Sequence, residues 1–157
     1  MKGAVLVTGG AGYIGSHTTK ALAEAGWRPV VFDNLASGHR EAARWGELVE
    51  GDVRDRDALV EAMRRHQVVG VIHFAGLIEV GRSVRRPDLF YDHNVGGTAA
   101  VLSAMAACEV SRLVFSSSAA VYGDVAAAGA AIAEDAPKAP ASPYGETKLI
   151  GDRKSVV

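Results

Sequence analysis

The sequence has a single cysteine, Cys108, so it cannot form an internal disulfide and fits a reducing compartment such as the cytoplasm. Its net charge of −1 gives no reason to expect nucleic acid or an anionic membrane as a partner. The apolar run near the start is too short for a signal peptide and far too short to span a bilayer. The five histidines lack the spacing of metal ligands, so we predict no metal site. Together these features predict a globular protein of the cytoplasm.

Apolar, β-branched runs alternate with segments of helical pattern along the chain. The runs predict strands over 4–9, 29–33, 47–52, 68–76 and 112–118. The segments between them predict helices over 13–25, 39–45, 56–66, 88–108 and from 143 onward. Continuous apolar runs are typical of parallel strands covered on both faces. The alternation therefore predicts an α/β fold with a doubly wound parallel sheet.

Three further residues and one segment refine this prediction. Asp55 or Asp57 is expected to cap the helix over 56–66, and Pro87 suits the first turn of the next helix. Residues 123–142 are rich in alanine, glycine and proline and are interpreted as a surface loop, in which "VAAAGAAIA" can form a short helix. We find no linker before residue 151, so residues 1–151 are predicted to form one domain.

A glycine-rich turn follows the first predicted strand and opens the first helix. Gly9, Gly12 and Gly15 recur at every third position in "TGGAGYIGSH", and such glycines let backbone approach a pyrophosphate at a helix N-terminus. Asp33 ends the second strand about 20 residues further on, where a carboxylate can bind adenosine ribose hydroxyls and repel a 2′-phosphate. This context favours a cofactor-binding turn over one that only closes a strand–helix junction. It also favours NAD over NADP as the cofactor.

Two acidic residues at strand ends have competing interpretations. Asp33 can be a local turn residue in "DNLASG", although the motif around it favours the ribose contact. Asp52 ends the third strand, where it can meet adenine or cap the helix that follows. On spacing alone these two roles of Asp52 are about equally well supported.

Polar residues with catalytic potential lie at and beyond the end of the fifth strand. The run "FSSS" stands where ligands bind in such sheets, although Ser116 can simply satisfy backbone groups. "SPYGETK" then places Tyr144 and Lys148 at i and i+4 of a helix, where a nearby ammonium favours the phenolate form of tyrosine. A tyrosine–lysine pair is common on any helix surface, and the glycine turn is what favours a catalytic role here.

Taken together, these motifs resemble the extended short-chain dehydrogenase/reductases. The resemblance runs from about Val5 to Ile150 through "TGGAGYIGSHT", "VFDNLASGHRE", "GDVRD", "VIHFAGLIEVGRSV", "YDHNVGGT", "LVFSSSAAVYGD" and "SPYGETK". It implies a Rossmann-like domain that binds NAD and a UDP-sugar. Within the family, the motifs look most like enzymes that invert carbon 4 of a nucleotide sugar, interconverting UDP-galactose and UDP-glucose through a 4-keto intermediate.

The resemblance also assigns site residues. Backbone at Gly9, Gly12, Tyr13, Ile14 and Gly15 would meet the pyrophosphate. Adenosine would lie against Asp33, Asn34, Leu35, Ala36, Ser37, Gly38, Asp52 and Val53. Phe74, Ala75, Gly76 and Asn94 would line the rest of the cofactor. Ser118 and Tyr144 would bind the carbon-4 hydroxyl, with Tyr144 as the base, while Lys148 would hold the nicotinamide ribose.

One departure and two rivals bear on that assignment. Ile78 stands where many such epimerases carry lysine, so one cofactor contact is absent or supplied elsewhere, with Arg82 as the candidate. A nucleotide-sugar 4,6-dehydratase or decarboxylase would need an acidic residue after the strand-end serine, where this chain has Ala119 and Ala120. A non-catalytic NAD-binding regulator would lack the Ser/Tyr/Lys set, which is present here. The resemblance also implies a homodimer for a full-length protein.

The family pattern continues beyond this chain with further strands and a smaller substrate domain. We therefore expect an N-terminal part whose sheet is incomplete and which is inactive alone. Residues 152–157, "DRKSVV", leave the family pattern and match the codons of a common sequencing adapter. They are predicted to be a non-native tail.

Overall fold

The computed structural model describes residues 2–128 and 131–155. The chain forms two compact units that interleave along the sequence. The first unit comprises Met1–Ala75 and Gly97–Ser116, and the second comprises Gly76–Gly96 and Ser117–Val157. Among the described residues, no helix is both long and apolar enough to cross a bilayer.

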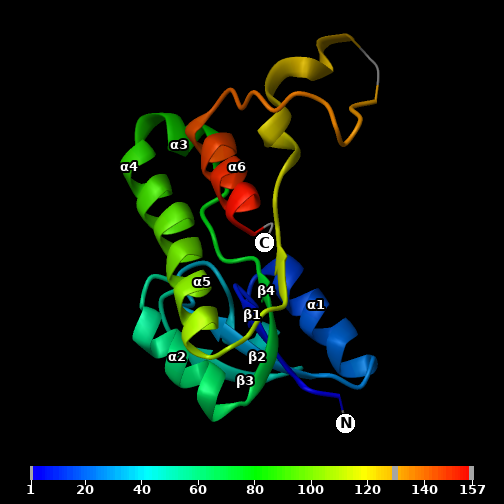
Figure 1. Ribbon diagram of the computed structural model, residues 1–157, viewed down its shortest axis with the longest axis vertical. Coiled ribbons are helices and arrows are strands. Elements are labelled where there is room, and N and C mark those ends of the chain that lie inside the picture. Colours follow the sequence, from blue (N-terminus) through cyan, green and yellow to red (C-terminus); the bar gives the residue numbers. More distant parts are fainter. Residues whose placement is uncertain (1, 129–130, 156–157) are drawn as a thin grey trace. The chain divides into compact units, whose positions relative to one another are not determined.

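A five-stranded parallel sheet forms the centre of the first unit (Figure 1). Its strands are β1 (Ala4–Thr8), β2 (Arg28–Asp33), β3 (Glu47–Glu50), β4 (Val68–His73) and β5 (Leu113–Phe115). They lie in the order β3-β2-β1-β4-β5, so the order reverses at β1, which pairs with both β2 and β4. This is the Rossmann-like arrangement, and each of the five predicted strands is confirmed, four of them in shorter form and β2 with one more residue.

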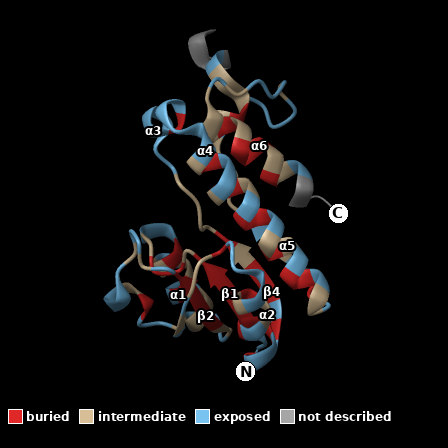
Figure 2. Cartoon of the chain, turned by 90° about the vertical axis from the view of Figure 1, so that its left-hand side faces the viewer, coloured by how far each residue is buried: buried red, intermediate tan, exposed pale blue. Residues whose placement is uncertain are grey.

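Helices cover both faces of this sheet. Helix α1 (Tyr13–Glu24) lies on one side, and α2 (Arg56–Arg65) and α5 (Gly97–Ala107) lie on the other (Figure 1). Leu6, Val30 and Phe32 belong to the large apolar cluster shared with α2 and α5, whereas Val31 packs with Ala11 on the opposite side. All of β1 is buried, as Figure 2 shows, which explains why its sequence lacks polar alternation.

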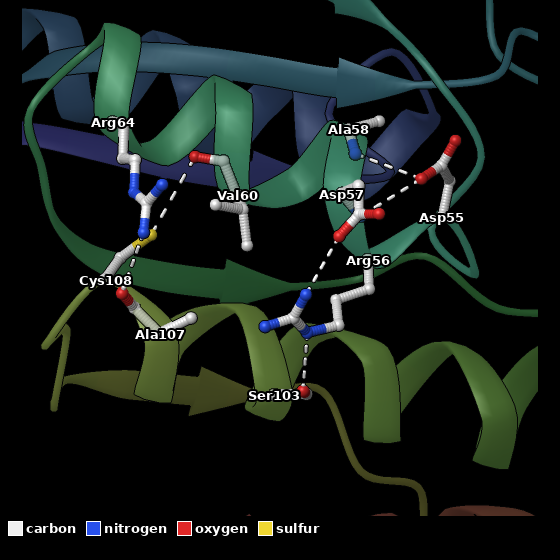
Figure 3. A network of polar contacts seen from close by, with 9 residues as sticks. All are labelled: Asp55, Arg56, Asp57, Ala58, Val60, Arg64, Ser103, Ala107 and Cys108. Carbon is white, nitrogen blue, oxygen red and sulfur yellow. Dashed lines mark hydrogen bonds and ion pairs between the residues drawn. The ribbon is translucent and has the colours of Figure 1, made fainter.

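Polar contacts supplement the apolar packing between α2 and α5, which lie side by side (Figure 3). The Asp55 carboxylate accepts hydrogen bonds from the first-turn N–H groups of α2, so the predicted cap is confirmed at Asp55. Arg56 Nε donates to Ser103 Oγ at 2.9 Å, and the Cys108 thiol lies 3.8 Å from the Val60 carbonyl oxygen. The two helices fixed in this way together cover one face of the sheet.

The second unit is built from helices. It contains α3 (Val80–Arg85), α4 (Pro87–Phe90), the π-helical turn η2 (Tyr91–Gly96), the 3-10 helix η3 (Ala119–Ala128) and α6 (Pro143–Ser155). Pro87 is in the first turn of α4, as predicted. Helix α6 packs against α3, η2 and η3.

Several predicted elements need correction. Helix α3 was not predicted, and the helix expected over 88–108 is interrupted by the π-helical turn η2. The helix expected over 39–45 is a 3-10 helix, η1 (Arg40–Ala43). The loop expected over 123–142 begins as part of η3, which bends at Gly123 because that residue has a φ of 68°. The short helix considered within that loop lies partly outside the described residues.

Candidate active site

The glycine turn between β1 and α1 is closed by contacts that exclude side chains. Gly9 has a φ of +70°, and a Cβ there would lie 2.7 Å from the Ala75 nitrogen. A Cβ on Gly15 would lie 2.6 Å from the Gly10 Cα and would collide with the Gly9 carbonyl oxygen. These contacts bring the start of α1 directly onto the turn, so larger residues cannot be accommodated at either position.

Gly12 is less crowded than these two glycines. A Cβ there would meet only the Gly9 oxygen, at 3.3 Å. Gly12 is the N-cap of α1 and supplies no side-chain cap, and the next two residues, Tyr13 and Ile14, extend their side chains into solvent. The first turn of α1 therefore presents backbone N–H groups over a bare surface, which suits a phosphate group.

Asp33, at the end of β2, fixes the glycine turn from the neighbouring strand. Its carboxylate accepts hydrogen bonds from the Ala11 N–H at 3.0 Å and the Leu35 N–H at 2.8 Å. Leu35 has a φ of 56°, a left-handed conformation that is uncommon for a bulky residue and is often found at functional sites. Asp33 thus has the local turn role considered above, yet its two oxygens retain lone pairs for hydroxyl ligands.

The residues after Asp33 form an open segment. Asn34, Ala36 and Ser37 are exposed, while Leu35 and Gly38 are partly buried. Gly38 lies close to the glycine turn, because a Cβ there would be 3.0 Å from the Ala11 Cβ. The segment from Asp33 to Gly38 therefore borders the turn on the side of β2.

Asp52 does not cap α2, so the capping alternative is wrong. Asp55 is the cap, whereas the Asp52 carboxylate accepts hydrogen bonds from Arg54 through the backbone N–H, Nε and Nη2 at 2.8–2.9 Å. These side-chain hydrogen bonds hold the pKa of Asp52 well below its ordinary value. Val53 is buried in the core beside Gly97, so its side chain is not available to a ligand.

A buried polar chain supports the end of β4. Thr8 Oγ1 lies 2.6 Å from His73 Nδ1, and His73 Nε2 lies 3.2 Å from Thr98 Oγ1. The Phe74 and Ala75 N–H groups both donate to the Thr8 carbonyl oxygen, so these two residues follow the strand closely. His73 is therefore a hydrogen-bonded core residue, as its place in an apolar strand suggests.

The three predicted catalytic residues lie in the second unit. Ser118 precedes η3, and its Oγ accepts a hydrogen bond from the Ala120 N–H at 3.2 Å. Tyr144 and Lys148 lie one turn apart on α6. Helix α6 packs closely on η3, because a Cβ on Gly145 would lie 2.6 Å from the Ala120 carbonyl oxygen. The helix with the tyrosine–lysine pair is thus packed directly against the residues that follow Ser118.

Whereas Lys2, Lys20 and Lys138 are exposed, Lys148 is buried. Only 4% of its surface is exposed, and a Cβ on Gly76 would lie 3.5 Å from its Nζ. Desolvation lowers the pKa of Lys148 from 10.5 to about 8. A lysine held in this way can change its protonation state near neutral pH, which is common at catalytic sites and uncommon on a helix surface.

Asn94 lies in the π-helical turn η2 and holds neighbouring segments. Its Oδ1 accepts from the Leu77 N–H at 2.8 Å, and its Nδ2 donates to the Leu77 carbonyl and to Thr147 Oγ1. π-Helical turns are rare and are frequently found at functional sites. The side chain predicted to line a cofactor therefore also fixes the segment after Gly76.

The predicted site residues fall into two groups, one in each unit. The first unit holds Gly9, Gly12, Tyr13, Ile14, Gly15, Asp33, Asn34, Leu35, Ala36, Ser37, Gly38, Asp52, Val53, Phe74 and Ala75. The second unit holds Gly76, Asn94, Ser118, Tyr144 and Lys148. Among the described residues, no three His, Cys, Asp or Glu side chains are grouped so that they could hold a metal ion.

Sequence reasoning missed the residues that surround Tyr144. Ser83 Oγ accepts from the Tyr144 N–H, Thr147 Oγ1 donates to the Tyr144 carbonyl, and Phe90 makes an edge-on ring contact. Thr147 and Phe90 could have been suspected from their spacing near predicted site residues. Ser83 gave no signal, because it lies in a short helix flanked by exposed apolar residues.

Comparison with known families matches residues 5–155 to the model described as "NAD dependent epimerase/dehydratase family". The chain belongs to this family. Among curated members, it is 51% identical over 146 residues to the UDP-glucose 4-epimerase of Rhizobium leguminosarum bv. trifolii, covering 93% of this chain and 44% of that protein. It is 47% identical over 154 residues to the Streptomyces lividans UDP-glucose 4-epimerase, covering 97% of this chain and 46% of that protein. The chain thus spans less than half the length of these relatives.

Solved structures give the same placement in the epimerase/dehydratase family. The UDP-glucose 4-epimerase of Brucella ovis in complex with NAD superposes with a TM-score of 0.93 at 48% identity. That match covers 98% of this chain and 46% of the other. The Rossmann-like fold read from the sequence is therefore shared with a family member whose structure contains NAD.

Ile78 is the position at which the resemblance leads us to expect a lysine. Its side chain is 68% exposed and has no charge, and Arg82 is engaged with Glu79 through a 3.0 Å ion pair. The candidate replacement for the usual lysine is therefore already bound to a neighbouring carboxylate. Whether Arg82 serves the cofactor stays a prediction.

Proposed function

We propose that this chain is the N-terminal, NAD-binding part of a UDP-glucose 4-epimerase, which interconverts UDP-galactose and UDP-glucose. The observation that carries the proposal is the buried Lys148 one turn beyond Tyr144, on a helix packed against the segment after Ser118. It is supported by the relatives named UDP-glucose 4-epimerase, which are 51% and 47% identical to this chain over the matched residues. The roles below, including the extent of one NAD-binding domain over 1–151, belong to the proposal.

The residues of the first unit fit NAD. The open first turn of α1 at Gly12 can take the pyrophosphate, and Asp33 retains acceptor sites for the adenosine ribose. The negative charge of Asp33 disfavours a 2′-phosphate. The Asp52 carboxylate is already hydrogen-bonded to Arg54. The exposed Asn34, whose amide nitrogen lies 3.4 Å from that carboxylate, would therefore bind adenine together with Asp52.

The residues of the second unit fit acid–base chemistry at a hydroxyl. Tyr144 would remove the proton of the carbon-4 hydroxyl and, after the 4-keto sugar has turned in the site, return a proton to the carbon-4 oxygen, with Ser118 Oγ bridging both transfers. Lys148, when protonated, favours the phenolate form of Tyr144 and donates hydrogen bonds to a ribose. NAD, held by the residues of the first unit, would supply the acceptor for the carbon-4 hydride and its donor toward the opposite face of the 4-keto sugar. The sugar is oxidised and then reduced, so no net oxidation occurs.

A 4,6-dehydratase is the nearest alternative within the family. It needs an acidic group beside the strand-end serine for proton transfer at a neighbouring carbon. Ala119 and Ala120 occupy those places, and neither can transfer a proton. Epimerisation alone is therefore favoured.

The test uses a hybrid in which residues 1–151 are joined to the remaining C-terminal part of the Rhizobium leguminosarum relative. We expect the hybrid to convert UDP-galactose to UDP-glucose, and Tyr144→Phe to lower turnover by roughly two to four orders of magnitude with NAD still bound. The 157-residue chain alone is the negative control.

Tight NAD binding by the hybrid without conversion of UDP-galactose would favour the regulator instead. Near-normal turnover by the Tyr144→Phe variant would contradict the role of Tyr144 as base. The proposal also includes a UDP-sugar partner, a cytoplasmic location, a homodimeric full-length protein and the non-native origin of residues 152–157.

A further inference from the structure

We propose that Ser83 is a positioning residue for Tyr144, an inference that rests on the function proposed above. Ser83 lies in α3 and is completely buried. Its Oγ accepts a hydrogen bond from the Tyr144 N–H at 3.1 Å and donates one to the Val80 carbonyl at 2.6 Å. The hydroxyl is thereby satisfied as donor and acceptor, with its acceptor side committed to the backbone of the proposed base.

The first turn of α6 explains why a distant side chain is needed. A helix leaves its first N–H groups without partners inside the helix. Pro143 has no N–H. Ser142 accepts the N–H of Gly145 at its Oγ and the N–H of Glu146 at its carbonyl oxygen, at 3.2 and 2.9 Å. The Tyr144 N–H is the one that the local cap does not satisfy. Ser83, 61 positions earlier, provides its acceptor.

The other groups of Tyr144 are fixed as well. Its carbonyl accepts from Thr147 Oγ1 at 2.8 Å, and Thr147 in turn accepts from Asn94 Nδ2 at 3.1 Å. Its ring meets Phe90 edge-on, with centroids 6.5 Å apart and planes at 85°. With the carbonyl and the ring held, the N–H contact to Ser83 completes the orientation of the Cα–Cβ bond. Displacement of the phenol by about 1 Å is enough to reduce turnover strongly.

The test replaces Ser83 in the hybrid and separates kcat from KM. In Ser83→Ala the Tyr144 N–H loses its acceptor, and we expect kcat to fall roughly 10–100-fold while KM for UDP-galactose changes by about two-fold or less. Ser83→Thr keeps the hydroxyl, and threonine in a helix can also donate to a preceding-turn carbonyl, so kcat should recover to within about five-fold of the parent. The matched control is Ser111→Ala at an exposed serine of the first unit, which should leave both constants unchanged.

Hydrogen exchange of the peptide containing Tyr144 gives a readout that does not depend on activity. We expect faster exchange in Ser83→Ala than in the parent, and no change in Ser111→Ala. Unchanged exchange, or an unchanged kcat in a Ser83→Ala hybrid that folds, would overturn the positioning role. Equal losses in Ser83→Ala and Ser83→Thr would also overturn it. An inactive parent hybrid would instead refute the proposed function, and exchange alone would then decide the role of Ser83.

Discussion

Replacing Lys148 by methionine should stabilise the protein near neutral pH, although it removes a proposed functional residue. Methionine has similar length and no charge, so it can occupy the buried site without desolvating an ammonium group. Burial lowers the pKa of Lys148 from 10.5 to about 8. At 1.36 kcal/mol per pKa unit, this difference corresponds to roughly 3 kcal/mol, an upper value because contacts of Lys148 are lost as well.

The pH dependence follows from the same shift. Between about pH 8 and pH 10.5 the unfolded chain binds more protons at this lysine than the folded chain, so stability rises with pH across that window. Below about pH 8 both states are protonated and the full cost remains. Lys148→Met should therefore be more stable than the parent at about pH 7 and should lack the rise toward about pH 10.

The assay is urea unfolding of the hybrid followed by circular dichroism at about pH 7 and about pH 10. Lys20→Met is the matched control, because Lys20 is exposed and pairs only weakly with Glu24 at 3.8 Å. It should change stability by less than about 0.5 kcal/mol at both pH values. A Lys148→Met variant that is less stable than the parent at about pH 7 would refute the reasoning, as would an unchanged pH slope.

Two further predictions concern the first unit, and equilibrium dialysis with melting curves checks both. Asp33→Ala should weaken NAD binding and relax discrimination against NADP, whereas unchanged selectivity would mean that another residue reads the ribose. Gly15→Ala should destabilise the fold by about 1–3 kcal/mol, since its Cβ collides with backbone at Gly9 and Gly10. Gly12→Ala is its control and should weaken NAD binding while lowering the melting temperature less, because its Cβ would touch the Gly9 oxygen at 3.3 Å without overlapping backbone. Equal melting losses in both variants would contradict this account.

Prediction from sequence succeeded where one local pattern decides the structure. Buried parallel strands need continuous apolar runs, so β1, β2 and β4 were evident, and the glycine turn and the Asp55 cap follow from short-range rules. The same rules placed Tyr144 and Lys148 one turn apart. Their spacing is a property of the helix, independent of its surroundings.

The features that were missed depend on tertiary contacts. Helix α3 has six residues with Val80 and Val84 exposed, so no amphipathic period predicts it. The π-helical turn η2 inserts an irregularity that leaves no mark in composition. The capping alternative for Asp52 failed because Arg54, two residues on, competes for the carboxylate, and spacing alone cannot rank two donors.

The position of β1 in the middle of the sheet has a consequence for how the chain assembles. β1 is the first strand of this chain, yet its two neighbours are β2 and β4, which begin only at Arg28 and Val68. Neither parallel pairing can form as a hairpin, because each must close a loop that contains at least one crossover. During synthesis, one edge of β1 therefore stays unpaired until several tens of further residues have been made. Non-local pairing of this kind slows folding and exposes strands to misassembly. Completion of the sheet centre is thus tied to the emergence of Val68–His73.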